Sequence, residues 1–234
     1  MSIEERVAAL DWVRIQNELD ERGWATTGPI LTSGERAATI YAYADDDLYR
    51  STVVMARHGF GRGEYRYFAN PLPPLIGALR GALYVRLAPV ANSWNERLGR
   101  NGSFPANHGD FIRQCHDAGQ LRPTPLILRY GPGDYNCLHQ DLYGDLSFPL
   151  QAAFLLSEPK DFEGGEFVLT EQRPRMQSRV HVVSLAAGEA VIFAVNHRPV
   201  RGSKGNYRVT MRHGVSPVRA GSRHTLGIIL HDAT

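Results

Sequence analysis

The chain has 234 residues, a formal net charge of +2 at pH 7, and a composition of 43% hydrophobic and 21% charged residues. This composition excludes disordered, collagen-like and coiled-coil proteins. No apolar run reaches about 18 residues, the length that a membrane helix requires, and the opening MSIEERVAAL lacks the basic-then-apolar order of a signal peptide. We therefore expect a soluble, cytoplasmic protein with no membrane partner, in which Cys115 and Cys137 are small buried residues and not a disulfide.

The first half of the chain mixes helical and extended patterns. Leu10, Ile15 and Leu19 follow helical spacing, and Gly23 marks the end of that helix. Further along, glycine- and proline-rich segments separate the remaining elements. The elements expected there are a short helix that Ser33 caps and that runs through 37–42, strands over 51–56 and 65–68 joined by HGFGRG, a helix from PLPP (71–74) to Leu98, and a helix over 107–118.

From Pro125 onward the pattern changes to short β-type runs separated by turn residues. The runs are PLILRY (125–130), QAAFLL (151–156), GEFVLT (165–170), RVHVVSL (179–185), EAVIFAV (189–195), YRVTMRHGV (207–215) and RHTLGIIL (223–230). They predict a sandwich or barrel of about eight strands. We expect one α+β domain over 1–234 with a mainly β core, in which a helical and mixed support region (1–120) packs on one sheet of the core (121–234).

Positive charge gathers in one segment of this second half. Between Gln172 and Arg212 there are eight basic residues and one acid, Glu189, so the segment carries +7 and the remainder of the chain −5. Arginine makes up 24 of the 26 basic residues. Such a segment suits a phosphate backbone but is also typical of a solvated strand face, and both readings stay open.

The strongest chemical signal is His139-Gln140-Asp141. On an extended chain the side chains of His139 and Asp141 point the same way, so both can reach one metal ion. His213 follows 74 residues later and Arg223 ten residues after that. Two imidazoles and one carboxylate leave three positions open on a metal, the arrangement that non-heme Fe(II) oxygenases use. A 2-oxo acid could take two of these positions and dioxygen the third, with Arg223 binding the distal carboxylate of the oxo acid.

These residues resemble the Fe(II)/2-oxoglutarate-dependent dioxygenase superfamily, and within it the prolyl-4-hydroxylase-like branch. The similar blocks run in order from Tyr130 to Leu230. They are the Tyr-x-x-Gly-x-x-aromatic-x-x-His-x-Asp pattern over 130–141, the FEGGE element over 162–166, the strand AGEAVIF over 187–193, and the block from His213 through Val215, Pro217, Val218 and Gly221 to Arg223. Two departures occur: Asn136 stands where the pattern has an aromatic, with Tyr135 one place earlier, and the run 154–156 lacks a tyrosine that some relatives have.

The resemblance implies a double-stranded β-helix, or jelly roll, whose cofactor is Fe(II) and whose co-substrates are 2-oxoglutarate and O₂. It implies that His139, Asp141 and His213 are the iron ligands, that Arg223 binds the distal carboxylate of 2-oxoglutarate, and that Tyr130 adds a hydrogen bond to it. The reaction would hydroxylate a C–H bond and release succinate and CO₂.

The substrate is less well defined. The segments YRYFANPLPP (65–74) and ANSWNERLG (91–99) look similar to bacterial oxygenases described as oxidative demethylases of damaged DNA. Alkylated bases in single-stranded or damaged DNA are thus the first expected substrate, with Tyr143, Arg201 and Arg212 as substrate-binding residues and Phe148 and Tyr207 as further aromatics for stacking. A protein or peptide side chain, as in prolyl hydroxylases, is the second candidate and a small metabolite the third.

Two other classes of protein fit these residues less well. A non-catalytic jelly-roll module that only binds metal predicts loss of one ligand or of Arg223, whereas all four residues are present. A zinc hydrolase would leave Arg223 and Tyr130 without a role. The remaining histidines are expected to be structural, and Glu163 and Glu166 to be solvated charges beside a Gly-Gly turn.

Overall fold

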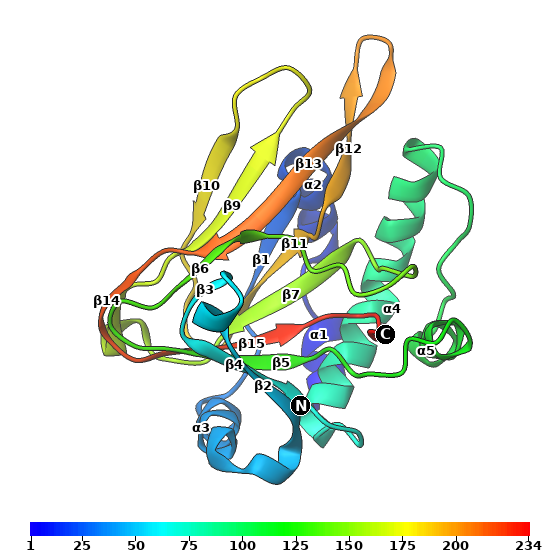
Figure 1. The fold of residues 1–234 in the computed structure, drawn as a ribbon. Coiled ribbons are helices and arrows are strands. Elements are labelled where there is room, and N and C mark those ends of the chain that lie inside the picture. Colours follow the sequence, from blue (N-terminus) through cyan, green and yellow to red (C-terminus); the bar gives the residue numbers. More distant parts are fainter.

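The computed structural model describes residues 1–234. Two antiparallel β-sheets face each other, and helices cover the outer face of the larger sheet (Figure 1). The α-helices are α1 (Ile3–Ala8), α2 (Trp12–Arg22), α3 (Ser33–Tyr41), α4 (Pro74–Arg97) and α5 (His108–Asp117). Single 3-10 turns are η1 (Ala42–Ala44), η2 (Asp46–Leu48), η3 (Met55–Arg57) and η4 (Pro159–Asp161).

The larger sheet has seven strands in the order β1-β11-β7-β15-β5-β4-β2. Its strands are β1 (Trp24–Pro29), β11 (Glu189–Ala194), β7 (Leu150–Leu155), β15 (Arg223–Ile228), β5 (Leu126–Tyr130), β4 (Glu64–Phe68) and β2 (Tyr49–Val54). The part of the chain before residue 120 thus supplies three strands to this sheet as well as all five α-helices.

The smaller sheet runs in the order β10-β9-β13-β6-β3, and β12 pairs with the free end of β13. Its strands are β10 (Arg179–Val183), β9 (Phe167–Gln172), β13 (Gly205–Val215), β6 (Tyr135–His139), β3 (Gly61–Arg62) and β12 (His197–Gly202). A separate two-stranded ladder joins β8 (Phe162–Gly164) to β14 (Val218–Gly221). Two facing antiparallel sheets with helices on one of them form the expected jelly roll, so the prediction of an α+β fold with a mainly β core is confirmed.

The two faces of the larger sheet have different surroundings, because side chains alternate along each strand. Phe154 and Ile192 point outward and are fully buried in the main hydrophobic core, to which α4 contributes Leu79 and Leu83. Because successive side chains of a strand point to opposite faces, the alternate residues of the same strands face the smaller sheet. The core therefore lies on one side of this sheet, and the space between the two sheets is left for a cavity.

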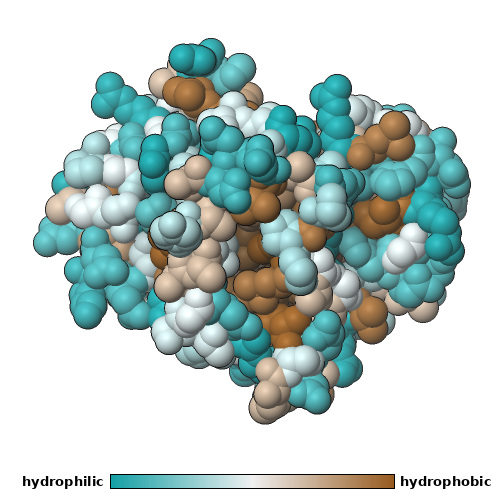
Figure 2. Space-filling model, turned by 90° about the horizontal axis from the view of Figure 1, so that it is seen from below, coloured by the Kyte–Doolittle hydropathy of each residue, from teal (hydrophilic) through white to brown (hydrophobic).

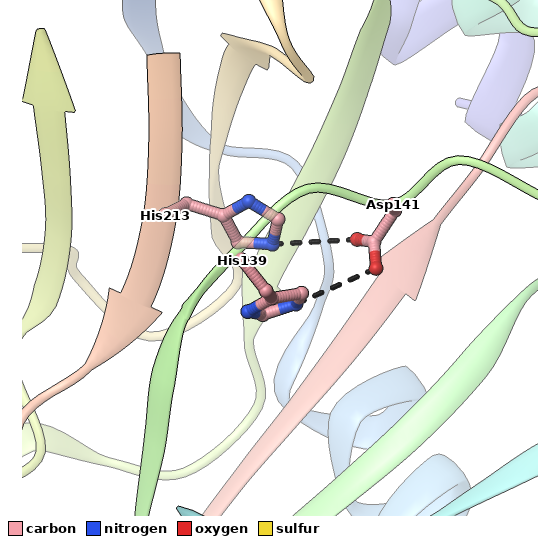
Figure 3. Close-up of side chains that lie close together, drawn as sticks. All are labelled: His139, Asp141 and His213. Atoms are coloured by element: carbon pink, nitrogen blue, oxygen red, sulfur yellow. Dashed lines mark ion pairs between the residues drawn. The ribbon is translucent and has the colours of Figure 1, made fainter. Parts of the chain in front are cut away.

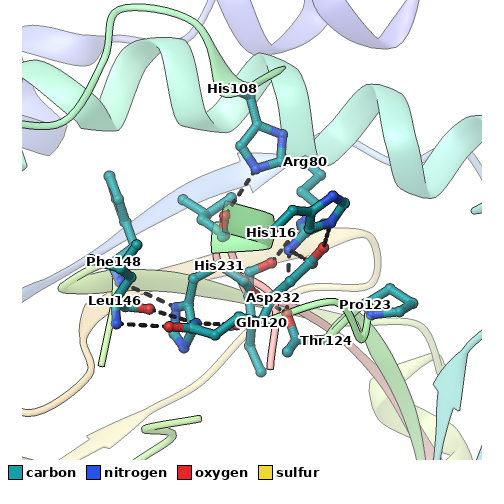
Figure 4. Close-up of polar contacts among 12 residues, drawn as sticks. Arg80, His108, His116, Gln120, Pro123, Thr124, Leu146, Phe148, His231 and Asp232 are labelled. Carbon is teal, nitrogen blue, oxygen red and sulfur yellow. Dashed lines mark hydrogen bonds and ion pairs between the residues drawn. The ribbon is translucent and has the colours of Figure 1, made fainter. Parts of the chain in front are cut away.

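A buried polar cluster ties the C-terminus to the helices (Figure 4). Arg80 of α4 donates to Oδ1 of Asp232 (2.7 Å) and to the carbonyl of Ile229 (2.8 Å). The amide of Gln120 donates to the carbonyl of Leu146 and accepts from its N–H, at 2.9 and 2.8 Å. The ring of His231 accepts from the N–H of Phe148 at 3.2 Å. These bonds fix the loop that connects β6 to β7.

Several local expectations are confirmed and others are wrong. Helix α2 ends at Gly23, which has a left-handed conformation (φ 80°). Ser33 is the first residue of helix α3 and not its cap, because Thr32 caps the helix through a reciprocal pair of bonds with Glu35. Cys115 is buried as expected, but Cys137 is exposed, since it lies on β6 beside the two-residue edge strand β3.

The surface is mostly hydrophilic. Seen from below the view of Figure 1, apolar side chains gather in a hollow near the middle of the face (Figure 2). None of the helices, α4 included, is both long and apolar enough to traverse a lipid bilayer.

Candidate active site

His139, Asp141 and His213 come together between the two sheets (Figure 3). His139 is the last residue of β6, and Asp141 follows two residues later, beyond the end of the strand. His213 lies on the neighbouring strand β13 in direct register with His139. Pairing of β6 with β13 therefore closes the gap of 74 residues that separates the two histidines in the sequence.

The three side chains face one point. Nε2 of His139 lies 3.4 Å from Oδ1 of Asp141, and Nε2 of His213 lies 3.3 Å from Oδ2. All three donor atoms are within 4.8 Å of one another. Two imidazole nitrogens and a carboxylate at this spacing form a donor set that suits a first-row transition metal and leaves part of its coordination sphere open.

Neighbouring groups hold these donors in place. Asp141 accepts a hydrogen bond of 2.7 Å from the hydroxyl of Tyr143 on one oxygen, and one of 2.7 Å from the amide of Gln151 on the other. Nδ1 of His139 donates to the carbonyl of Cys137 at 2.8 Å, which leaves Nε2 as the basic nitrogen. Such outer bonds orient ligands before a metal arrives.

The environment of His213 is apolar. Its ring lies 4.6 Å from the ring of Phe193 and 5.9 Å from that of Phe167. Burial, followed by the charge of His139, lowers the pKa of His213. Burial opposes ionisation of Asp141, but its contacts with both histidines hold the pKa of this carboxyl well below its ordinary value. Asp141 is therefore an anion at neutral pH, as a metal ligand must be.

A second polar pair lies deeper in the same space. Arg223 begins β15, and Tyr130 ends β5 as its direct partner in register. Arg223 is 3% exposed and Tyr130 fully buried, yet Nε and Nη1 of the arginine and the hydroxyl of the tyrosine have no hydrogen-bond partner. Burial raises the pKa of Tyr130 to about 12, so its hydroxyl stays protonated. A buried cation without an anion is costly, and this pair fits a carboxylate.

A glycine makes room for this arginine. Gly165, in the turn after β8, has a φ of +64°, and a Cβ there would lie 2.8 Å from Cδ of Arg223 and 2.9 Å from Cγ2 of Val218. The FEGGE element that the sequence singled out is thus the wall behind the guanidinium. Glu166 of the same element bonds to Ser216 and does not line the cavity.

The three-donor cluster and the pair of Arg223 and Tyr130 line one cavity of about 310 Å³. Its walls are largely apolar and aromatic. Phe60 and Leu138 line it while remaining 48% exposed, so they lie where the cavity meets solvent. The aromatic and aliphatic lining also includes Tyr65, Tyr67, Leu126, Leu128, Leu185 and Ile229. The cavity has room for a small oxo-diacid at Arg223 and a further group beside the three donors.

The expected substrate residues are not all brought to this cavity. Tyr143 lines it, although its hydroxyl is engaged by Asp141. Arg212 and Arg201 are exposed and do not line it, and Arg212 lies on the opposite face of β13 from His213. The expectation that Phe148 is available for stacking is wrong, because Phe148 is fully buried.

Other sequence expectations concern residues outside the site. His181, His197, His224 and His231 do not line the cavity, in keeping with structural roles. Sequence reasoning missed Gln151 and Phe60. Gln151 could have been found from the sequence, since it is the one polar residue in the apolar run QAAFLL.

The fold and this residue set define an oxygenase of the Fe(II) and 2-oxoglutarate class, an oxidoreductase. Residues 63–233 match the model of a protein family described as "Oxygenase, catalysing oxidative methylation of damaged DNA". The match covers well over half of the chain, and the chain belongs to this family.

Two relatives are uncharacterized proteins of Mycobacterium tuberculosis, from strains CDC 1551 and H37Rv. Each is 48% identical to this chain over 167 residues, which are 71% of the chain and 72% of the relative.

Solved structures with the same fold include two prolyl hydroxylases. A prolyl-4-hydroxylase of Pseudomonas putida has 16% identity and a TM-score of 0.52, covering 92% of this chain and 96% of that one. A prolyl hydroxylase of Trichoplax adhaerens, in complex with a peptide fragment of the hypoxia inducible factor oxygen degradation domain, has 14% identity and a TM-score of 0.57, covering 96% and 90%. A 2OG-Fe(II) oxygenase family oxidoreductase of Burkholderia pseudomallei has 18% identity and a TM-score of 0.54, covering 95% and 93%. At these identities the similarity shows the fold alone.

Proposed function

We propose that this oxygenase holds one Fe(II) ion through His139, Asp141 and His213 and binds 2-oxoglutarate through Arg223 and Tyr130. The observation that carries the proposal is the pairing, in one cavity, of a three-donor cluster with a buried arginine that has no anionic partner. The donors match iron, and the unpaired cation matches the distal carboxylate of the oxo acid.

When bound, iron and 2-oxoglutarate together with O₂ supply the oxidising power to hydroxylate a C–H bond, with release of succinate and CO₂. The residues of the chain orient the metal ligands and exclude water from the site. Gln151 and Tyr143 keep the carboxylate of Asp141 oriented, and Phe167 and Phe193 keep water from His213. The aromatic wall positions the carbon to be oxidised.

For the substrate we propose an alkylated base in single-stranded or damaged DNA. Three observations support this choice: the family description names damaged DNA, Phe60 stands where the cavity opens, and Tyr65 and Tyr67 line it. Aromatic side chains suit a flat, unpaired base. Hydroxylation of an N-methyl group lets its carbon leave as formaldehyde, so the reaction removes the methyl group.

A prolyl side chain of a protein is the second candidate. The structural neighbours from Pseudomonas putida and Trichoplax adhaerens are prolyl hydroxylases, and the second of them is in complex with a peptide. The apolar walls of the cavity here would also accept a pyrrolidine ring.

The test measures succinate and formaldehyde from purified protein given Fe(II), 2-oxoglutarate and air. The arms are methylated single-stranded DNA, the same DNA without methyl groups, a proline-rich peptide, and no substrate, with His139→Ala as the control. Formaldehyde with methylated DNA alone supports demethylation. Succinate formation stimulated by the peptide, with a hydroxylated peptide as product, would establish the second candidate, and the absence of iron-dependent succinate in every arm would refute the oxygenase assignment of this site.

A further inference from the structure

The smaller sheet carries a second, polar groove, away from the cavity between the sheets. Strands β9 and β13 are paired only as far as Gln172 and Thr210. Beyond this pair the β9–β10 and β12–β13 hairpins separate, as seen at the top of Figure 1. The space between them is a groove of about 380 Å³, and we refer to its lining as the basic groove: Gln172, Arg173, Pro174, Arg175, Arg208 and Thr210.

The positive charge of the basic groove is not neutralised. The acid beside it, Glu171, is 2% exposed and already accepts hydrogen bonds from both Arg198 (2.6 Å) and Arg173 (2.7 Å). Arg175 and Arg208 take part in none of the ion pairs of the structure. Burial, and then the charge of Arg208, lowers the pKa of nearby His197 to about 4. The groove is thus ready for an anion.

Further arginines lie on the same face of the sheet as the basic groove. Along β13, Arg208, Thr210 and Arg212 alternate with inward residues, so they form an outward row with about 7 Å between neighbours. Arg201 of β12 pairs with Asn206 and lies on this face as well. Thr210 is three residues from His213, which is about 10 Å along the strand. The row therefore runs from the groove toward the strand position that carries a candidate iron ligand.

The backbone at Arg175 also indicates use of its side chain. Arg175 has a φ of 62° and is the one residue other than glycine with a positive φ. Glycine would be favoured in this conformation, yet an exposed arginine occupies it. Strained positions of this kind are concentrated at binding sites.

We propose that the basic groove binds the phosphate backbone of single-stranded nucleic acid, with Arg175 and Arg208 as its principal contacts and Arg201 and Arg212 extending the track. Guanidinium groups bind phosphate oxygens in pairs, and a row of them follows a repeating anion. This inference deepens the proposed action on DNA, on which it rests, by assigning a place for the strand outside the cavity.

The experiment measures binding of a fluorescein-labelled oligothymidine 20-mer by fluorescence anisotropy, over a series of KCl concentrations. Removing two phosphate contacts to a single strand lowers the magnitude of the salt slope by about 1.4. We expect the charge-reversed double variant Arg175→Glu/Arg208→Glu to bind at least about 10-fold more weakly than the wild type at the same salt concentration. The matched control is Arg86→Glu/Arg122→Glu, which makes the same charge change at exposed arginines outside the groove. Arg175→Lys/Arg208→Lys, which keeps the charge, should retain most of the affinity.

Equal affinities of the groove variant and the control variant would overturn the proposal, and so would equal binding of a peptide nucleic acid of the same sequence, which carries no phosphates. Measuring formaldehyde release in parallel separates the two claims. If binding depends on the groove but methylated DNA releases no formaldehyde, the proposal for the groove stands and demethylation is refuted. If the groove variant demethylates DNA as well as the wild type does, the proposal for the groove is refuted and the proposed function stands.

Discussion

Gln151 donates a hydrogen bond of 2.7 Å to Oδ2 of Asp141 from within the larger sheet. Gln151 is 4% exposed on β7, and the hydroxyl of Tyr143 holds the other oxygen of the same carboxylate. The two bonds therefore fix the plane of the carboxylate between the two histidines, in the orientation that a metal ion requires.

Replacing Gln151 should weaken metal binding without disturbing the oxo-acid site. Gln151→Met keeps the length of the side chain and removes the donor, so we expect Mn²⁺ or Fe²⁺ to bind about 10-fold to 100-fold more weakly, as is usual when an outer partner of a ligand is lost. Isothermal titration with Mn²⁺ measures this. Gln114→Met, at an exposed position on α5, is the matched control. An unchanged affinity for the metal would show that Asp141 does not depend on Gln151.

Arg223 should affect the oxo acid and not the metal. Arg223→Met removes a buried cation that has no partner, so the affinity for 2-oxoglutarate should fall about 100-fold while the affinity for Mn²⁺ stays the same. The free variant should also melt at a higher temperature, because burying an unpaired charge is costly. Titrations with 2-oxoglutarate and with Mn²⁺ and a melting curve check the three statements. Loss of the metal in this variant would contradict the role assigned to Arg223.

More of the candidate site than of the strand pairing could be predicted from the sequence. His139 and Asp141 could be paired from the period of an extended chain, but only the register of β6 with β13 shows that His213 lies directly opposite His139. That register depends on long-range strand pairing, which no local pattern encodes. Strand β1 combines Trp24 and two threonines, which favour a strand, with Gly28 and Pro29, which do not, and its pairing with β11 decides the outcome.

The surroundings of the predicted substrate-binding residues also depend on long-range structure that the sequence pattern does not show. The sequence predicts that Tyr143 contacts the substrate, and the structure adds a bond to Asp141 that depends on the loop between β6 and β7. Arg212 could not be assigned to a face of its strand from charge alone. Its position next to His213 places it on the outer face, beside Arg208, and outside the cavity.

Gly165 should be intolerant of a side chain for two separate reasons. Its φ of +64° is unfavourable for alanine, and the new Cβ would lie 2.8 Å from Cδ of Arg223. Gly165→Ala should therefore lower stability by about 1 kcal/mol or more and raise the KM for 2-oxoglutarate, with little change in metal affinity. Urea unfolding and a KM determination test this. Gly34→Ala, in a helix with open space around its Cα, should not lower stability. Wild-type values for Gly165→Ala in both measurements would contradict the role of this glycine.

His231 should make the fold sensitive to acid. Burial, and then the charge of Arg80, lowers the pKa of its ring to about 4 in the folded protein, whereas the pKa of an unfolded histidine is about 6.5. The folded state thus binds fewer protons than the unfolded state between these two values. The stability associated with His231 is complete above about pH 6.5 and falls by about 1.4 kcal/mol per pH unit as the pH drops toward 4.

The ring accepts from the N–H of Phe148 within the cluster of Figure 4, so His231→Asn keeps an acceptor near that position and removes the titration. Unfolding by urea at pH 7, 6 and 5 gives the free energy of unfolding as a function of pH. The slope for His231→Asn should be smaller by nearly one proton than that of the wild type, even if the variant is less stable at every pH. His108, whose pKa burial also lowers to about 4, continues to contribute in both proteins. His58→Asn, the same substitution at an exposed position, is the control. Parallel curves for the wild type and His231→Asn would show that the ring of His231 is not kept neutral by the fold.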